Sequence, residues 1–160
     1  MKYGLIACGG TFDIIHKGHE ALLEKAFEVG EKVIIGISSD NLVKILGKKH
    51  PVKPLDKRFK NLKKYLERKG WLKRSIIVVL EDRYGPPIHI DDVEALIVSE
   101  ETYKIGLKTN RIRRRKKMKP LKIIKIPLVL AEDGKPISCT RIKIGEIDRN
   151  GKILNKPLFS

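Results

Sequence analysis

Five short apolar runs, rich in β-branched residues, recur along the chain and are separated by stretches with helical periodicity. The runs span residues 3–8, 32–37, 76–80, 95–98 and 122–126, and the last is predicted to reach toward Leu130. Helical patterns fill residues 20–29, 40–46, 55–69 and 100–110. Strands that alternate with helices pair in parallel, so we predict an α/β fold: one doubly wound domain with a parallel sheet of about five strands. The domain is expected to fill residues 1–160, with its core at about 3–152 and a short C-terminal tail.

The third helical pattern, residues 55–69, is predicted to be closed by Gly70. Phe59, Leu62 and Leu66 are expected to face the core, because they recur at helical spacing. Arg58 either faces a site at the rim of the sheet or lies on an exposed helix face. Packing is the default role for Trp71.

The first strand runs directly into a turn that suits a phosphate group. Gly9 and Gly10 end the strand, and the next helix begins near Lys17. Glycine has no Cβ, so a ligand can approach the backbone closely, and the amino end of a helix favours an anion. His16 and His19 are three residues apart and therefore share one side of the first helical turn. This combination predicts a phosphate site that includes both histidines.

A metal site is the alternative explanation for the two histidines, since histidine is the commonest metal ligand. The two cysteines, Cys8 and Cys139, lie far apart in the sequence, and no His-x3-His or Cys-x2-Cys pair is present. We therefore predict a phosphate site and no protein-bound metal.

A second helix start follows the last strand. Ser138 is a suitable N-cap residue, and Cys139, Thr140 and Arg141 come directly after it. A cap alone explains the serine, but hydroxyls, N–H groups and a guanidinium also suit the β- and γ-phosphates of a nucleotide. Residues 38–40, 82–85 and 99–102 follow the other strands. Because ligands of doubly wound folds bind at the carboxyl ends of the strands, all these segments should line one rim.

These motifs resemble those of the nucleotidyltransferase superfamily, which includes cytidylyltransferases and the adenylyltransferases of coenzyme A, NAD and FAD synthesis. The segments 9–19 and 137–142 are shared widely in that superfamily. Residues 99–102 (Ser-Glu-Glu-Thr) and 145–148 (Gly-Glu-Ile-Asp) narrow the resemblance to the archaeal-type phosphopantetheine adenylyltransferases, which are similar to the adenylyltransferase domain of animal coenzyme A synthase. The resemblance spans about residues 3–152, includes 82–86, and implies a Rossmann-like fold.

The resemblance implies that the chain transfers the adenylyl group of ATP to 4′-phosphopantetheine, giving dephospho-coenzyme A and pyrophosphate. The acceptor phosphate would attack the α-phosphorus in line. No activated nucleophile is evident, so positioning and charge neutralisation would carry the catalysis. Mg²⁺ would accompany the triphosphate.

The resemblance also assigns roles to residues of the first motif. His19 would stabilise the charge on the α-phosphate in the transition state, and His16 would assist it and contact the triphosphate. Thr11 would bridge the acceptor and the α-phosphate, and Phe12 would contact the nucleotide through its backbone. The other nucleotide contacts implied are Gly10, Glu100, Glu101, Thr102, Asn110, Ser138, Cys139, Thr140 and Arg141. Cys139 replaces the usual hydroxyl residue and leaves an oxidisable thiol in the site.

Lys44 is expected to hold the phosphate of the acceptor, with Lys48 or Lys49 as alternatives. Residues 99–102 lack the arginines that bind substrates in bacterial relatives, so bacterial contacts do not carry over there. Asp13 either caps the first helix or fixes a neighbouring backbone group, and its role is structural rather than catalytic. His50 and His89 sit beside prolines and are expected at the surface.

Two alternatives to this function stay open. The same chemistry would serve CTP with a polyol phosphate, or ATP with FMN, although residues 135–138 lack the arginine and glycine usual in a cytidylyltransferase. The other alternative is a basic nucleic-acid-binding protein, since the net charge is +16 and seven of the nine residues 111–119 are basic. That run contains no aromatic residue and follows a helix, so we interpret it mostly as a solvated helix end. Nucleic acid is not an expected partner.

Bulk properties agree with a compact enzyme. We expect no membrane span and no signal peptide, and two cysteines in a chain of this length favour the reducing cytoplasm. A composition rich in Lys, Arg, Glu and Ile, without any Gln, favours a thermophilic source. The sequence leaves open the oligomeric state, feedback by coenzyme A and the role of residues 157–159.

Overall fold

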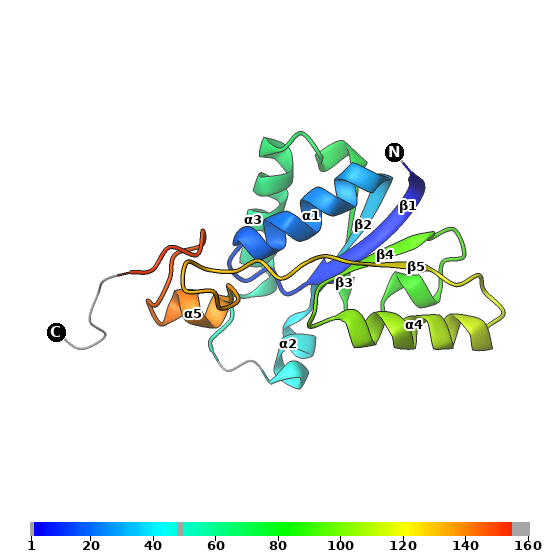
Figure 1. Cartoon of the computed structure of the whole chain (residues 1–160). Coiled ribbons are helices and arrows are strands. Elements are labelled where there is room, and N and C mark those ends of the chain that lie inside the picture. The colour runs from blue at the N-terminus through cyan, green and yellow to red at the C-terminus, as the bar shows by residue number, and fades with distance from the viewer. Residues whose placement is uncertain (1, 48–49, 155–160) are drawn as a thin grey trace.

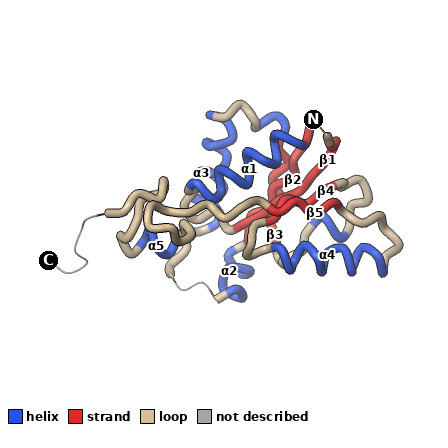
Figure 2. The backbone as a smooth tube through the Cα atoms, viewed as in Figure 1, coloured by secondary structure: helices blue, strands red, loops and turns tan. Residues whose placement is uncertain are grey.

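The computed structural model describes residues 2–47 and 50–154. Within these residues five strands form one sheet: β1 (Tyr3–Gly10), β2 (Gly30–Ser38), β3 (Ser75–Leu80), β4 (Ala95–Val98) and β5 (Lys122–Lys125). All neighbouring strands are parallel, and their order is β3-β2-β1-β4-β5. The predicted parallel sheet of about five strands is therefore confirmed. Figure 2 shows the strands gathered at the centre of the molecule.

Helices cover both faces of the sheet. They are α1 (Lys17–Val29), α2 (Asp40–Leu46), α3 (Leu55–Arg68), α4 (Tyr103–Arg115) and α5 (Cys139–Lys143), with two short 3₁₀ turns, η1 (Leu72–Arg74) and η2 (Pro86–Ile88). Helices α1 and α3 lie against one face, and α4 and η2 lie on the other (Figure 1). The arrangement is doubly wound, as the alternation of strands and helices predicts. Among the described residues, no helix is long and apolar enough to cross a membrane.

Side chains alternate between the two faces along the central strands, as the pleat requires. Ile6 and Ile35 pack in the larger core cluster with α1 and α3, whereas Ala7 and Ile34 face the smaller cluster on the α4 side. Trp71 closes the larger core by stacking on Phe27, with ring centroids 4.6 Å apart. The packing role expected for Trp71 is thus observed.

Helix α3 buries Leu62 and Leu66 as predicted, but the rest of its buried face differs from the prediction. Phe59 is exposed, and the buried positions are Arg58, Leu62, Tyr65 and Leu66. These four positions repeat at helical spacing from Arg58 rather than from Phe59, so the apolar stripe begins one residue earlier and begins with a charged side chain. The prediction that Phe59 faces in was wrong, and the exposed placement considered for Arg58 was wrong as well.

The strand predicted to reach Leu130 ends earlier. The ladder between β4 and β5 runs only from the Ala95–Lys122 pair to the Val98–Lys125 pair. Leu130 instead forms an isolated antiparallel bridge with Pro136. The chain after β5 therefore leaves the sheet and builds a third small core cluster around Ala131, Ile137 and Ile147, which supports α5.

The basic run 111–119 contains one residue that is not solvated. Arg113 on α4 is fully buried, and its guanidinium donates to the backbone carbonyls of Pro87, Ile90, Asp91, Val93 and Lys119. Its neighbours Arg114 and Arg115 are exposed. The interpretation as a solvated helix end holds for these neighbours but not for Arg113, which ties α4 to the segment before β4.

Arg113→Met is expected to lower the free energy of unfolding by about 2–3 kcal/mol, because it leaves buried carbonyl groups without donors. Arg114→Met is the matched control, since the same change at an exposed neighbour should stay within about 0.5 kcal/mol. Urea unfolding of both variants measures the difference. Equal losses in the two variants would show that the buried contacts contribute nothing specific.

Candidate active site

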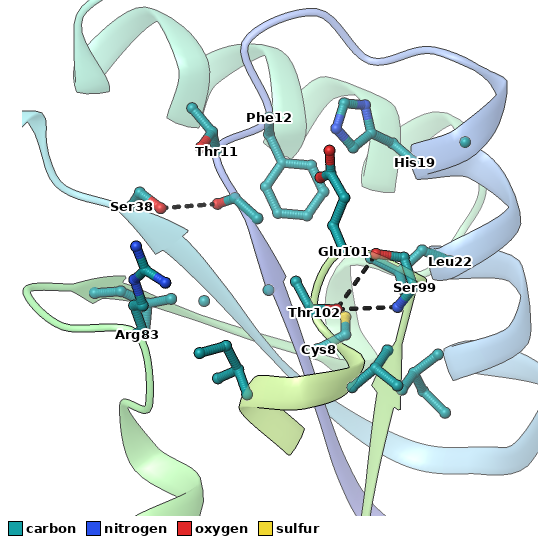
Figure 3. Close-up of a pocket in the computed structure, with 18 of the residues that line it drawn as sticks. Cys8, Thr11, Phe12, His19, Leu22, Ser38, Arg83, Ser99, Glu101 and Thr102 are labelled. Carbon is teal, nitrogen blue, oxygen red and sulfur yellow. Dashed lines mark hydrogen bonds between the residues drawn. The ribbon is translucent and has the colours of Figure 1, made fainter. Parts of the chain in front are cut away.

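A cavity of about 610 Å³ lies at the carboxyl ends of the central strands. Its lining comes from every rim segment singled out in the sequence, and includes residues 9–13, 18–19, 83–84, 98–99 and 137–140. Figure 3 shows several of these side chains around the cavity, among them Thr11, Phe12, His19 and Glu101. The fold therefore brings together motifs from opposite ends of the chain, as the rule for doubly wound folds predicts.

The two histidines of the first motif form a reciprocal cap on α1. The Nδ1 atom of His16 accepts the N–H of Gly18 at 3.0 Å, and the Nδ1 atom of His19 accepts the N–H of His16 at 3.3 Å. The rings stack with centroids 4.0 Å apart. The histidines were expected on one side of the first turn; the structure shows in addition that His16 is itself the N-cap.

This cap determines which nitrogen of each ring carries the proton. A neutral imidazole has one donor and one acceptor, so a ring whose Nδ1 accepts a backbone N–H carries its proton on Nε2. Burial lowers the pKa of His16 from 6.5 to about 4, which keeps that ring neutral at neutral pH. His16 and His19 thus carry N–H donors at the ring edges opposite the capping bonds, and both side chains line the cavity.

The hydrogen bonds accepted by the two Nδ1 atoms also argue against a metal bound by His16 and His19. His16, His19 and Cys139 each place a ligand-type atom within 4.8 Å of the other two, a proximity that the sequence spacing did not suggest. A histidine that binds a metal normally donates its second ring N–H to an acceptor. Here the second nitrogen of each ring accepts a hydrogen bond instead, so the pair suits an anionic oxygen better than a cation.

Stability should depend on pH through His16. Between pH 6.5 and about 4 the unfolded chain binds a proton at this residue and the folded protein does not, so the free energy of unfolding falls as the pH falls. The expected contribution is about 3 kcal/mol across this window. His16→Gln should lose correspondingly less stability between neutral pH and pH near 4. Denaturant unfolding at the two pH values measures this, and parallel losses in both proteins would contradict it.

Phe12 adopts an unusual backbone conformation at the cavity edge. Its φ angle is 53°, in the left-handed region that residues with a Cβ rarely adopt. Its side chain is fully buried and lies 5.2 Å, centroid to centroid, from the ring of His19. Thr11 and Phe12 line the cavity with Gly10, and the backbone contact of Phe12 with the nucleotide stays a prediction.

The second helix start lies next to the first motif. The Ser138 Oγ accepts the N–H of Arg141 at 3.2 Å, so the predicted N-cap is observed. The Cys139 Sγ donates to the carbonyl of Ile14 at 3.5 Å, a direct link between the two motifs. Ser138, Cys139 and Thr140 all line the cavity.

Arg141 behaves differently from this prediction. Its guanidinium pairs with Glu146, 2.8 Å from Nε, and with Asp133, and these two carboxylates raise its pKa. Arg141 is not among the residues that line the cavity. The structure therefore holds the side chain against the turn before α5, and its predicted phosphate contact stays a prediction.

The segment after β4 is only partly directed to the cavity. Glu101 and Thr102 line it, and the Thr102 Oγ1 accepts the N–H of Ser99 at 3.0 Å. Glu100 points elsewhere and forms an ion pair of 2.7 Å with Lys125. Asn110 is also outside the cavity lining, because both ends of its amide bond the backbone of Leu121, at 2.7 and 2.9 Å. The structure does not bring Glu100 and Asn110 to the site.

The acceptor lysine is not brought to the cavity either. Leu42 and Leu46 are the α2 residues that line it, and Lys44, two positions from each, is exposed on another side of the helix. Residues 48–49, the alternatives, and 157–159 lie outside the described residues. Among the described residues, Arg83 is the one lysine or arginine that lines the cavity (Figure 3), and no role was predicted for it from the sequence.

Asp13 is a junction rather than a helix cap. Its carboxylate is buried, accepts the N–H of Lys53 at 2.9 Å, forms an ion pair with Lys143, and lies 3.6 Å from the Nδ1 of His50. Burial alone would raise the pKa of Asp13, but Lys143 and the Lys53 N–H together hold it below its ordinary value. The cap interpretation was wrong and the backbone-fixing one was right. His50, expected at the surface, is instead a largely buried partner of Asp13 that lines the cavity, while His89 is exposed as expected.

Comparison with known proteins agrees with this geometry. The sequence pattern described as cytidylyltransferase-like matches residues 7–144. The chain belongs to this family of nucleotidyltransferases. It is 42% identical over 147 residues to a phosphopantetheine adenylyltransferase of Methanopyrus kandleri, a match that covers 92% of each chain. A phosphopantetheine adenylyltransferase of Pyrococcus abyssi is 40% identical over 156 residues, which cover 98% of this chain and 99% of that relative.

A solved structure is also similar. A protein of unknown function from Archaeoglobus fulgidus has a TM-score of 0.69 and 34% identity, and the match covers 79% of this chain and 89% of that chain. The resemblance inferred from the motifs is therefore confirmed at the level of the family and of the fold. The roles of the individual site residues stay predictions.

Proposed function

We propose that the protein transfers the adenylyl group of ATP to 4′-phosphopantetheine, giving dephospho-coenzyme A and pyrophosphate. The observation that carries this proposal is the pair of stacked histidines, whose capping bonds leave N–H donors at Nε2, in a cavity shared by two helix starts. Both helix starts favour anions, so a triphosphate and a phosphate acceptor fit side by side. The names of the relatives in Methanopyrus kandleri and Pyrococcus abyssi support this pair of substrates.

The residues of the two helix starts have different roles in this reaction. His19 and His16 donate to the α-phosphate oxygens, and this donation grows stronger as negative charge develops there during in-line attack. The N–H groups and hydroxyls of Ser138 and Thr140 hold the far phosphates of the leaving pyrophosphate. The acceptor phosphate performs the attack itself, so the site needs to supply only position and charge.

Two further assignments complete the proposal. Mg²⁺ enters as part of the nucleotide substrate, bound mainly by phosphate oxygens and water, as it usually is in nucleotide sites. Arg83, a cation that lines the cavity, is a second candidate for the acceptor phosphate beside Lys44. We propose a cytoplasmic setting, in keeping with the soluble substrates.

The test is pyrophosphate release with Mg²⁺ across pairs of nucleotide and acceptor. ATP and CTP are each crossed with 4′-phosphopantetheine, glycerol 3-phosphate and FMN. Turnover confined to ATP with 4′-phosphopantetheine supports the proposal. Turnover with another pair keeps the mechanism and replaces the substrates, and no turnover with any pair refutes the enzymatic function.

A further inference from the structure

Arg58 is fully buried beside the phosphate-binding turn. From α3 its Nη1 donates to the carbonyl of Thr11 at 2.9 Å and to that of Ser38 at 2.7 Å, which joins the carboxyl ends of β1 and β2. Its Nε donates to the carbonyl of Lys53 at 2.7 Å, and its Nη2 pairs with the Oδ1 of Asp40 at 3.0 Å. One side chain thus holds three backbone carbonyls around the rim.

The bond to Thr11 fixes the direction of the N–H that follows it. The peptide between Thr11 and Phe12 is trans, so its C=O and N–H point in opposite directions. With the carbonyl turned toward buried Arg58, the N–H of Phe12 points the opposite way, and both residues are among those that line the cavity. No described residue accepts a hydrogen bond from this N–H.

Phe12 requires such support because its φ of 53° is unfavourable for a residue with a Cβ. Rotating the Thr11–Phe12 peptide by about 180° would return φ to the ordinary extended region. The same rotation would turn the N–H away from the cavity and break the bond to Arg58. The guanidinium therefore selects the peptide orientation in which a donor faces the ligand.

We propose that Arg58 is a positioning residue, which holds the Thr11–Phe12 peptide so that the Phe12 N–H donates to a phosphate oxygen of the nucleotide. This inference rests on the proposed function for its effect on turnover, but its effect on nucleotide binding stands independently. Arg58 touches neither the substrate nor the reacting atoms. It acts through the backbone of Thr11 alone.

Arg58→Lys is the test, because a single ammonium cannot span the three carbonyls that the guanidinium holds. Arg113→Lys is the matched control: it is the other fully buried arginine on a helix, and its bonds go to different carbonyls, none in the first motif. Both variants should lower the melting temperature. Both variants are therefore assayed well below the lower of their two melting temperatures. There, Arg58→Lys is expected to lose about 100-fold in kcat, whereas Arg113→Lys should keep kcat close to wild type.

The amide resonance of Phe12 in ¹⁵N-labelled protein gives a direct readout that a structural role would not move. Adding ATP should shift this resonance in wild type and in Arg113→Lys, and much less in Arg58→Lys. Arg58→Gln, whose shorter side chain carries a single NH₂ group in place of the guanidinium, is the second variant and must show the same losses of kcat and of the ATP-induced shift. The proposal would be overturned if the folded Arg58 variants kept the wild-type kcat and the same ATP-induced shift of the Phe12 amide as wild type. If wild type lacks turnover but its Phe12 amide responds to ATP, the proposed substrates fail while this assignment survives.

Discussion

His19→Ala is expected to lower kcat by about 10³-fold, the largest effect of any single change at the site. The substitution removes an Nε2–H donor that the cap on α1 holds at the cavity, where the proposed mechanism places the developing charge of the α-phosphate. Such a donor acts mainly in the transition state, so kcat and kcat/KM should fall together. Steady-state pyrophosphate release with ATP and 4′-phosphopantetheine measures both constants.

Two comparisons make this test specific. His89→Ala removes an exposed histidine that does not line the cavity and should leave kcat unchanged. His19→Gln keeps an amide donor and should recover part of the loss. A rise in KM with an unchanged kcat in His19→Ala would mean that His19 binds the ground state and the transition state equally, which contradicts the proposed role.

The strands of this fold can be predicted from the sequence because each is an apolar run bounded by polar or turn residues. Hydrophobic periodicity located β1 to β4 with ends that differ by at most two residues from those observed. It also located the start of β5, but the predicted extension toward Leu130 was wrong, because the chain stays apolar after Lys125 while leaving the sheet. Periodicity reports burial: beyond the end of the ladder Ile126 is still buried in the larger core, and Val129 and Ala131 pack in the third cluster.

The motifs were also predictable, since each is a short local pattern at the end of a strand. The buried arginines were not, because their partners are backbone carbonyls from distant segments, and a carbonyl leaves no trace in the sequence. For Arg58 one signal existed: it lies four positions before Leu62 and eight before Leu66, on the apolar stripe of α3. An arginine on such a stripe indicates a buried network rather than a solvated face.

Contacts that were predicted from the family resemblance could not all be checked against the sequence, for a different reason. The resemblance places Arg141 at a triphosphate, but in this chain Asp133 and Glu146 supply two carboxylates for its guanidinium. A charged group pairs with whichever opposite charges lie near it in the folded protein, and the sequence does not show which these are. The contact of Arg141 with a triphosphate therefore stays a prediction.

Gly18→Ala is the second change with a large expected effect, and it should lower activity far more than stability. An alanine in the first turn of α1 should favour the helix by about 1 kcal/mol. Its Cβ would lie 2.7 Å from the Cε1 of His16, however, closer than side chains tolerate. The added methyl group would push the ring of His16. Because this ring stacks on that of His19, the movement would displace the Nε2–H donors of both histidines. We expect a loss of about 100-fold in kcat without loss of the folded state.

A double-mutant cycle with His16→Ala decides whether the glycine acts through that ring. If Gly18 is needed only because the His16 side chain lies against it, Gly18→Ala should have little further effect on kcat once His16 is alanine. Additive losses would instead place the added methyl group in the path of the substrate, since Gly18 itself lines the cavity. Either way, the glycine between the two histidines is explained by what its missing side chain makes room for, and the cycle identifies whether that is the protein's own imidazole or the ligand.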